Sequence, residues 1–247
     1  DGPAARHDQI ENTAGAGSPA PRNEVKTDMT DQIKHHLTDA LLMAYSAGTL
    51  HEAFSLTVAA HISMCDECRA RLGAFDTMGG ALMDSCTTTE MAAGSLEATM
   101  ERIKAGKPAK TTDAPSRRKD KGVLPGPIQD YVGGGIDAVK WKSVGMGVKQ
   151  AILPTSRDAS ARLLYIPAGA AVPDHGHAGT ELTLVLRGAF KDEMDHFGPG
   201  DIEVANEDLD HTPIADIGED CICLAATDAP LRFKSLIPRI AQPFLRI

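Results

Sequence analysis

The chain has 247 residues, a formal net charge of −9 and 42% hydrophobic residues, an ordinary content for a folded protein. Its acidity disfavours direct contact with nucleic acid, and no apolar run reaches the roughly 18 residues of a membrane-spanning helix. Five cysteines without a signal-peptide pattern indicate a cytoplasmic protein and exclude a disulfide scaffold. This length allows two modest domains with separate cores, and we predict the α+β class.

The first 28 residues differ from the rest in composition. They are rich in glycine, alanine, proline and polar residues and show no hydrophobic period, so we expect residues 1–28 to be disordered. Met29 is a candidate for the natural start of the folded sequence.

Residues 29–107 are predicted to form a small helical domain. Thr38 or Asp39 can cap a first helix that ends near Gly48. Three further helices are expected, over residues 52–63, from 66 to about 75, and over 95–104.

The last of these helices carries an apolar stripe. Leu96, Met100 and Ile103 stand at positions i, i+4 and i+7 and therefore share one face. The stripe belongs either to an internal core or to a surface that packs on a partner protein. So small a region has difficulty burying every apolar stripe by itself, and we leave the two readings open.

A first candidate metal site lies between the second and third helices. His61, Cys65 and Cys68 follow the spacing H-x3-C-x2-C, which places the three side chains on one helical stripe. Two thiolates and an imidazole suit zinc, and His36 or His35 upstream can supply the fourth ligand. An isolated C-x2-C pair could instead be redox-active, but the added histidines favour zinc.

Residues 108–126 are predicted to be a flexible basic linker because they combine prolines with a lysine and arginine run. We expect a β-barrel domain over residues 127–247 to follow, with early strands around Trp141, residues 151–153 and residues 161–166.

A second candidate metal site stands in this barrel. His175 and His177 are two residues apart, so on a strand both point to the same face. Glu181 then begins an alternating strand in which Thr183 and Val185 share its face and the intervening leucines form the other. A buried carboxylate at this position is costly unless it is paired or bound to a metal.

The segment from Gly169 to Gly188 resembles the first motif of the cupin family, G-x5-H-x-H-x3-E-x6-G, at every position. The resemblance implies an antiparallel β-barrel with a metal held by His175, His177, Glu181 and a later histidine, His211. The proline and glycine that usually precede that histidine are replaced here by Asn206 and Asp208. This ligand set suits zinc first, with manganese, iron or nickel behind it.

The whole pattern H-x24-H-x3-C-x2-C, followed by a cupin, resembles the ChrR-type zinc-binding anti-sigma factors over about residues 30–247. Shared segments include HHLTDALLMAY and ICLAATDAPLRF. The resemblance implies His36 as the first zinc ligand, with His35 second in rank. It also implies a partner, an extracytoplasmic-function (ECF) sigma factor, that is released in response to singlet oxygen or organic hydroperoxides.

Two alternatives to the regulator remain open at this point. The first is a metal-dependent cupin oxygenase in which the helical domain is a zinc-stabilised accessory module. The second, ranked last, is a protein of metal storage or metal sensing.

The other cysteines are assigned no ligand role. Cys221 and Cys223 share one face of a predicted strand, and we prefer buried core residues to a redox pair. Cys86 lies in a polar stretch and is expected to be a bystander.

Overall fold

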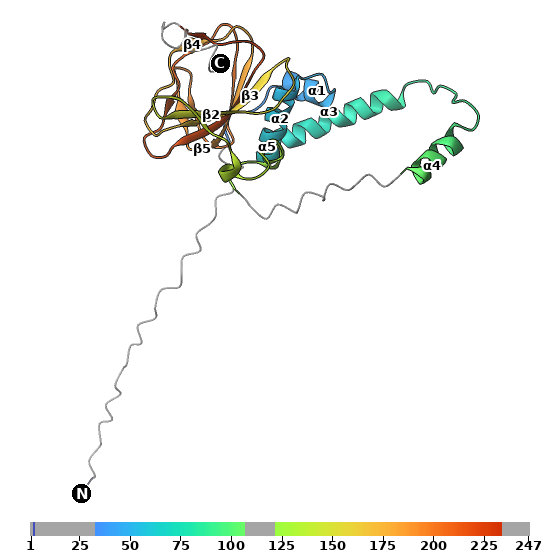
Figure 1. Cartoon of the computed structure of the whole chain (residues 1–247). Helices are drawn as coiled ribbons and strands as arrows, with labels where there is room; N and C mark the ends of the chain where they lie inside the picture. Colours follow the sequence, from blue (N-terminus) through green and yellow to red (C-terminus); the bar gives the residue numbers. More distant parts are fainter. Residues whose placement is uncertain (1, 3–32, 107–121, 234–247) are drawn as a thin grey trace.

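The computed structural model describes residue 2, residues 33–106 and residues 122–233. The leader expected over residues 1–28, apart from residue 2, lies outside the described residues, as do Met29 and most of the expected linker. Figure 1 shows helices in the first half of the described chain and a β-barrel in the second. The predicted α+β class, with helices before an antiparallel barrel, is therefore confirmed.

The helical part begins with three helices that meet near the metal-binding sequence, and α4 follows. Their bounds are α1 Asp39–Ser46, α2 Glu52–Met64, α3 Asp66–Asp84 and α4 Ser95–Ala105. The Thr38 hydroxyl caps α1 by accepting from the Leu41 N–H, and Gly48 follows this helix with a positive φ of 67°. The third helix ends at Asp84 and not near Phe75. The Gly79–Gly80 pair lowers helix propensity by only about 1 kcal/mol per residue, which does not stop the helix.

Two short helices and twelve strands complete the described chain. The short helices are α5 Gly126–Val132 and the 3₁₀ helix Ile136–Ala138. The strands are β1 Lys142–Gly145, β2 Val148–Ile152, β3 Ser160–Ile166, β4 His175–Gly176, β5 Glu181–Arg187, β6 Phe190–Lys191, β7 His196–Phe197, β8 Ile202–Ala205, β9 Asp210–His211, β10 Ile214–Ala215, β11 Cys221–Thr227 and β12 Arg232–Phe233.

The strands form a six-stranded antiparallel sheet and two three-stranded sheets. The large sheet has the order β1-β2-β3-β11-β5-β8, and the small ones are β10-β6-β7 and β12-β4-β9. The register separates two faces, because Cys223 pairs with Leu164 and Val185 while Leu224 pairs with Leu163 and Leu184. The side chains level with Cys223 point into the barrel, and those level with Leu224 point out of it. This is the separation of faces that the alternation of β5 predicted.

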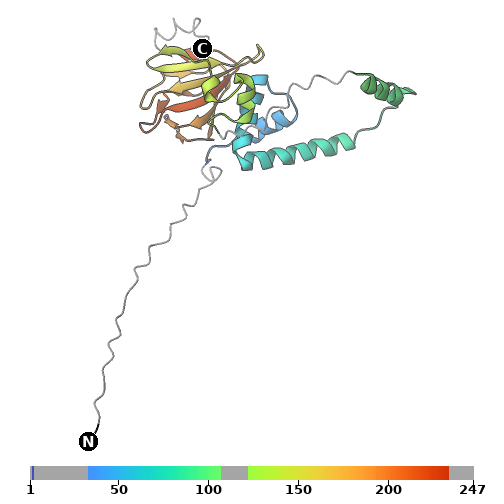
Figure 2. The same ribbon diagram turned by 60° about the horizontal axis from the view of Figure 1, so that its bottom comes forward.

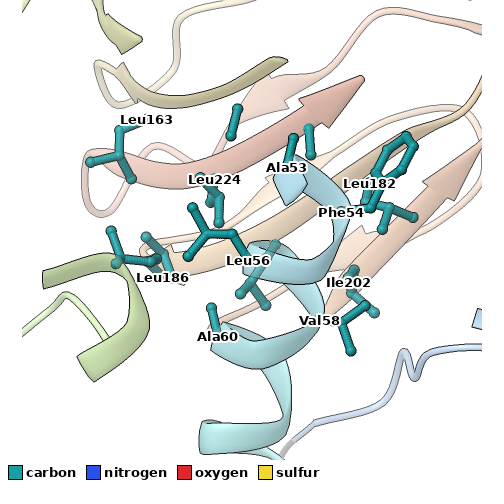
Figure 3. Close-up of a cluster of buried hydrophobic side chains, with 14 of the residues drawn as sticks. Ala53, Phe54, Leu56, Val58, Ala60, Leu163, Leu182, Leu186, Ile202 and Leu224 are labelled. Atoms are coloured by element: carbon teal, nitrogen blue, oxygen red, sulfur yellow. The ribbon is translucent and has the colours of Figure 1, made fainter. Parts of the chain in front are cut away.

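The outer face of the large sheet is covered by α2, as Figure 3 shows. The apolar side chains that meet there come from both parts of the chain: Ala53, Phe54, Leu56, Val58 and Ala60 from α2, and Leu163, Leu182, Leu186, Ile202 and Leu224 from the sheet. The expectation of two separate cores is therefore wrong. The core strands are apolar on both faces, so the outer face must also be buried, and α2 buries it.

The fourth helix lies apart from this core. Figures 1 and 2 show α4 beyond the far end of α3, away from the barrel, and none of its residues is buried against the described part of the chain. Within that same part, no helix is long and apolar enough to cross a membrane.

Candidate metal centres

The helical cluster consists of His36, His61, Cys65 and Cys68. One ligand atom from each of the four lies within 4.8 Å of all the others. The His36 Nδ1 is 3.3 Å from the Cys65 Sγ and 3.7 Å from the Cys68 Sγ. His36 precedes α1, His61 lies in the last turn of α2, and Cys65 follows α2 and caps α3. The structure thus brings together the four residues selected from the sequence.

The outer ring nitrogens of both histidines point at hydrogen-bond acceptors. The His61 Nδ1 donates to the Gly200 carbonyl oxygen at 3.0 Å, and the His36 Nε2 is 3.3 Å from a Glu67 carboxylate oxygen. Each inner nitrogen therefore carries the lone pair, which is the arrangement of metal-binding histidines. The buried His61 Nε2 has no hydrogen-bond partner among the described residues. Two imidazole nitrogens and two sulfurs fit tetrahedral zinc.

Burial shifts the pKa of His61 and of Cys68 in this cluster. It lowers the pKa of His61 to about 4, so the imidazole is neutral at pH 7 and free to act as a ligand. It also raises the pKa of Cys68 to about 11, which opposes a thiolate in the protein alone. A divalent cation reverses that preference, because a coordinating thiol is deprotonated.

His35 lies outside the helical cluster and contacts the barrel. Its Nε2 is 3.1 Å from an Asp195 carboxylate oxygen, and its ring packs on Phe197 with centroids 4.4 Å apart. The two adjacent histidines therefore point in different directions. Of the pair, only His36 is placed to act as a ligand.

The barrel cluster consists of His175, His177 and His211, all buried. The His211 Nε2 is 3.3 Å from the Nε2 of each of the other two. His175 in β4 pairs with His211 in β9, so the register of this small sheet fixes their approach. Three convergent imidazole nitrogens form an arrangement that a metal ion stabilises.

The outer nitrogens of two of these histidines, His175 and His211, are held as well. The His175 Nδ1 donates to the Pro173 carbonyl at 2.9 Å. The His211 Nδ1 is 2.8 Å from an Asp192 oxygen and 3.1 Å from a Glu203 oxygen. These two carboxylates were not predicted from the sequence. Glu203 lies only eight residues before His211, but nothing in the spacing marks Asp192.

The two carboxylates set the electrostatics around His211. Burial alone lowers its pKa, but the nearby carboxylates of Glu203 and Asp192 raise the pKa of His211 to about 9. Burial raises the pKa of Glu203 to about 7. By contrast, burial lowers the pKa of His175 and of His177. The carboxylates therefore make His211 the most basic imidazole of the three, and such partners strengthen a metal ligand.

Glu181, the fourth residue of the expected ligand set, lies beside the three histidines. One carboxylate oxygen is 3.7 Å from the His177 Nδ1, and the other accepts a hydrogen bond from the Thr183 hydroxyl at 3.0 Å. The group whose ligand atoms converge contains the three imidazoles without this carboxylate. The role of Glu181 as a ligand is therefore a proposal.

A cavity of about 320 Å³ adjoins the barrel cluster. His175, Glu181 and His211 stand on its wall, and most of the remaining lining is apolar. Cys221 and Cys223 are buried in the inner core, as expected, and Cys223 also reaches this cavity. The Cys223 thiol donates to the Cys221 sulfur, and this contact together with burial raises the pKa of Cys223, which keeps it a thiol. Cys86 is exposed and far from both clusters in sequence.

The antiparallel barrel with inward histidines, joined to a helical His₂Cys₂ cluster, defines a cupin protein with two candidate metal centres. Residues 131–230 match the family described as the ChrR cupin-like domain. The anti-sigma-E factor ChrR of Cereibacter sphaeroides is 58% identical over 217 residues, which are 87% of this chain and 99% of that protein. The chain therefore belongs to the ChrR family of anti-sigma factors, which confirms the resemblance drawn from its motifs.

A solved structure agrees with this assignment. The crystal structure of Rhodobacter sphaeroides SigE in complex with the anti-sigma ChrR matches with a TM-score of 0.70 and 55% sequence identity. The match covers 79% of this chain and 99% of that one.

Proposed function

We propose that the chain is an anti-sigma factor that holds an ECF-type sigma factor away from RNA polymerase and releases it under oxidative stress. The inducing oxidants are singlet oxygen or organic hydroperoxides. The observation that carries the proposal is the exposed α4, in a chain closely similar to an anti-sigma-E factor. Binding a subunit of RNA polymerase places the action of this protein in the cytoplasm.

The apolar stripe of α4 faces away from the described core. Leu96 is 68% exposed, Met100 44% and Ile103 67%, so the stripe does not belong to an internal core. The second half of α3 adds further exposed side chains, Met78, Leu82 and Met83. Exposed apolar side chains gathered on two successive helices indicate a protein-binding site. We propose that α3 and α4 together contact the sigma factor.

The helical cluster is proposed to bind zinc through His36, His61, Cys65 and Cys68. The first helix buries only Leu42, so packing alone fixes its position weakly. Zinc ligation supplies folding free energy, on the order of 10 kcal/mol in small zinc domains. The ion would thus set the angles between α1, α2 and α3, and with them the sigma-binding surface.

The barrel is proposed to be the sensor. His175, His177 and His211 would hold a metal, with Glu181 as the fourth ligand. This mixed nitrogen and oxygen ligand set suits zinc, manganese, iron and nickel. We propose zinc first and the other three metals after it. We assign sigma-factor binding to residues 29–107 and the sensing of oxidants to residues 127–247. Residues 108–126 link these two parts. The rival assignment, a cupin oxygenase, is less well supported, because the relative at 58% identity and the solved structure at 55% identity are both named as anti-sigma factors.

The sigma-binding surface can be tested in the full chain with Leu96→Asp and Ile103→Asp. Both side chains are exposed, so the melting temperature should stay unchanged, while affinity for the cognate ECF sigma factor should fall by about 30-fold or more. Glu101→Gln, an exposed polar change on the same helix, is the matched control. Undiminished affinity in the double aspartate variant would exclude α4 from the interface.

A further inference from the structure

The two candidate metal centres are joined by one short stretch of the barrel, residues 200–203. At one end of the stretch, the Gly200 carbonyl accepts the hydrogen bond from the His61 Nδ1 at 3.0 Å. At the other end, a Glu203 carboxylate oxygen is 3.1 Å from the His211 Nδ1. A member of each cluster is therefore held by the same few residues, which lead directly into β8.

Asp201 fastens this stretch to the segment that carries His36. Its side chain is only 3% exposed. One carboxylate oxygen accepts the backbone N–H groups of Lys34 and His35, at 2.6 and 2.9 Å. The other oxygen accepts the Gly198 N–H at 2.8 Å, which anchors the carboxylate in the barrel. The backbone immediately before His36 is thus tied to the barrel by a buried, charge-assisted contact.

Gly200 allows the two parts to approach this closely. Its φ is +90°, and a Cβ at this position would lie 2.5 Å from the Ile33 Cδ1. Ile33 itself is buried in the core that α2 and the sheet share. Only glycine fits both the backbone conformation and the space. The contact between residues 33–35 and residues 200–202 is also closed by the Ile202 N–H, which donates to the His35 carbonyl at 3.3 Å.

We infer that residues 200–203 couple the barrel centre to the helical centre, with Gly200 and Asp201 as positioning residues for His61 and His36. A change at His211 moves Glu203, and the short stretch passes this displacement on because its surroundings are close-packed. The hydrogen bonds to His61 and to the backbone before His36 then weaken. As a route to sigma release, this inference rests on the proposed function, whereas the coupling itself is a property of the chain alone.

The test measures how fast Cys65 and Cys68 are alkylated in the zinc-loaded full chain, with each site mapped by mass spectrometry. All variants carry Cys86→Ser, which removes an exposed thiol. Four proteins form a cycle: the parent, His211→Ala, Asp201→Asn and the double variant. An asparagine has one acceptor oxygen, so it cannot serve both the Gly198 N–H and the two N–H groups of residues 34 and 35.

Each single change should speed the alkylation of Cys65 and Cys68 by about tenfold, the low end of the roughly 10- to 100-fold loss of metal affinity that follows when the support of a ligand is weakened. The double variant should be no faster than Asp201→Asn, because the connection is already broken. If Asp201 had only a structural role, His211→Ala would still speed the alkylation of Cys65 and Cys68 in the Asp201→Asn background. Fully multiplicative effects, or no effect of His211→Ala on these cysteines, would overturn the coupling.

Two further variants keep the test decisive. Asp208→Asn changes an exposed aspartate in the turn after β8 and should leave the alkylation rates unaltered. If Asp201→Asn does not fold, Ile33→Ala loosens the same contact from the helical side and takes its place in the cycle. Sigma affinity is measured in parallel. If the parent chain does not bind the sigma factor, the proposed function is refuted. If it binds but the effects of the two substitutions on the alkylation rates multiply, only the coupling is refuted.

Discussion

The carbonyl oxygen of Gly200 accepts a hydrogen bond from His61, so a loop of the barrel orients a side chain of the helical metal cluster. The same helix that carries His61 also covers the outer face of the large sheet. The sigma-binding part and the proposed sensor are therefore two faces of one packed unit. A change in the barrel has a short physical route to the helical metal cluster, from which α3 begins.

Replacing both Cys65 and Cys68 with serine should abolish sigma binding. Serine hydroxyls are poor zinc ligands, and without the proposed ion the helices would lose the associated folding free energy. Binding of the double variant to the sigma factor should fall below detection in a titration in which the parent binds. Cys86→Ser, which removes an exposed cysteine, should behave as the parent does. Parent-like affinity in the double serine variant would refute the zinc-cluster hypothesis.

The fragment 29–107 should bind the sigma factor but be less stable than the full chain. It keeps all four residues of the helical cluster, yet it exposes Phe54 and Leu56, which the sheet buries in the full chain. Each such side chain loses about 1.5–3 kcal/mol of burial free energy when exposed. Thermal unfolding and sigma titration of both proteins check this prediction. A fragment as stable as the full chain would mean that the packing of α2 on the sheet contributes little.

His177→Ala should leave basal inhibition intact and blunt the response to oxidants. The variant removes one imidazole of the barrel cluster, while the contact between Glu203 and His211 stays in place. A sigma-dependent reporter, followed before and after exposure to singlet oxygen or an organic hydroperoxide, measures both properties. His196→Ala changes an exposed barrel histidine and is the control. A normal oxidant response in His177→Ala would remove the barrel cluster from signalling.

The contact between α2 and α5 should make stability depend on pH in the alkaline range. The Tyr131 hydroxyl donates to a Glu52 carboxylate oxygen at 2.7 Å, and this hydrogen bond raises the pKa of Tyr131 to about 12. Because the folded pKa lies above the unfolded value of about 10, the contact stabilises the fold fully below pH 10. That contribution is then lost as the pH rises from about 10 to about 12.

Tyr131→Phe isolates this contribution. The variant should unfold at a lower temperature than the parent at pH 8, and the difference between the two should vanish as the pH approaches 12. Fluorescence of Trp141, the single tryptophan of the chain, reports the unfolding. A difference that stays constant across the alkaline range would show that the tyrosine proton does not matter.

Spacing alone predicted much of both candidate centres. The positions of His61, Cys65 and Cys68 on one helical stripe, and of His175 and His177 on one strand face, follow from the periods of helix and strand. The residues that hydrogen-bond the candidate metal ligands, or the backbone beside them, were not predictable in this way. Asp192, Gly200 and Asp201 reach the clusters through tertiary contacts and obey no local period.

The shared core was missed for a different reason. The strand β11, Cys221–Thr227, is buried at every position, so its sequence does not show which face lies inside the barrel. A strand without a polar face must be covered on both sides, and this signal could have indicated a helix on the outer face. The stripe of α4 was ambiguous in sequence because periodicity cannot tell an internal core from a binding surface.

Co-expression of the tagged chain with its cognate sigma factor in bacterial cytoplasm, followed by affinity purification and metal analysis, tests the central claim most directly. The account predicts an equimolar complex that carries zinc in the helical centre and a metal in the barrel. A chain that elutes alone with iron in the barrel would contradict it and would favour the oxygenase.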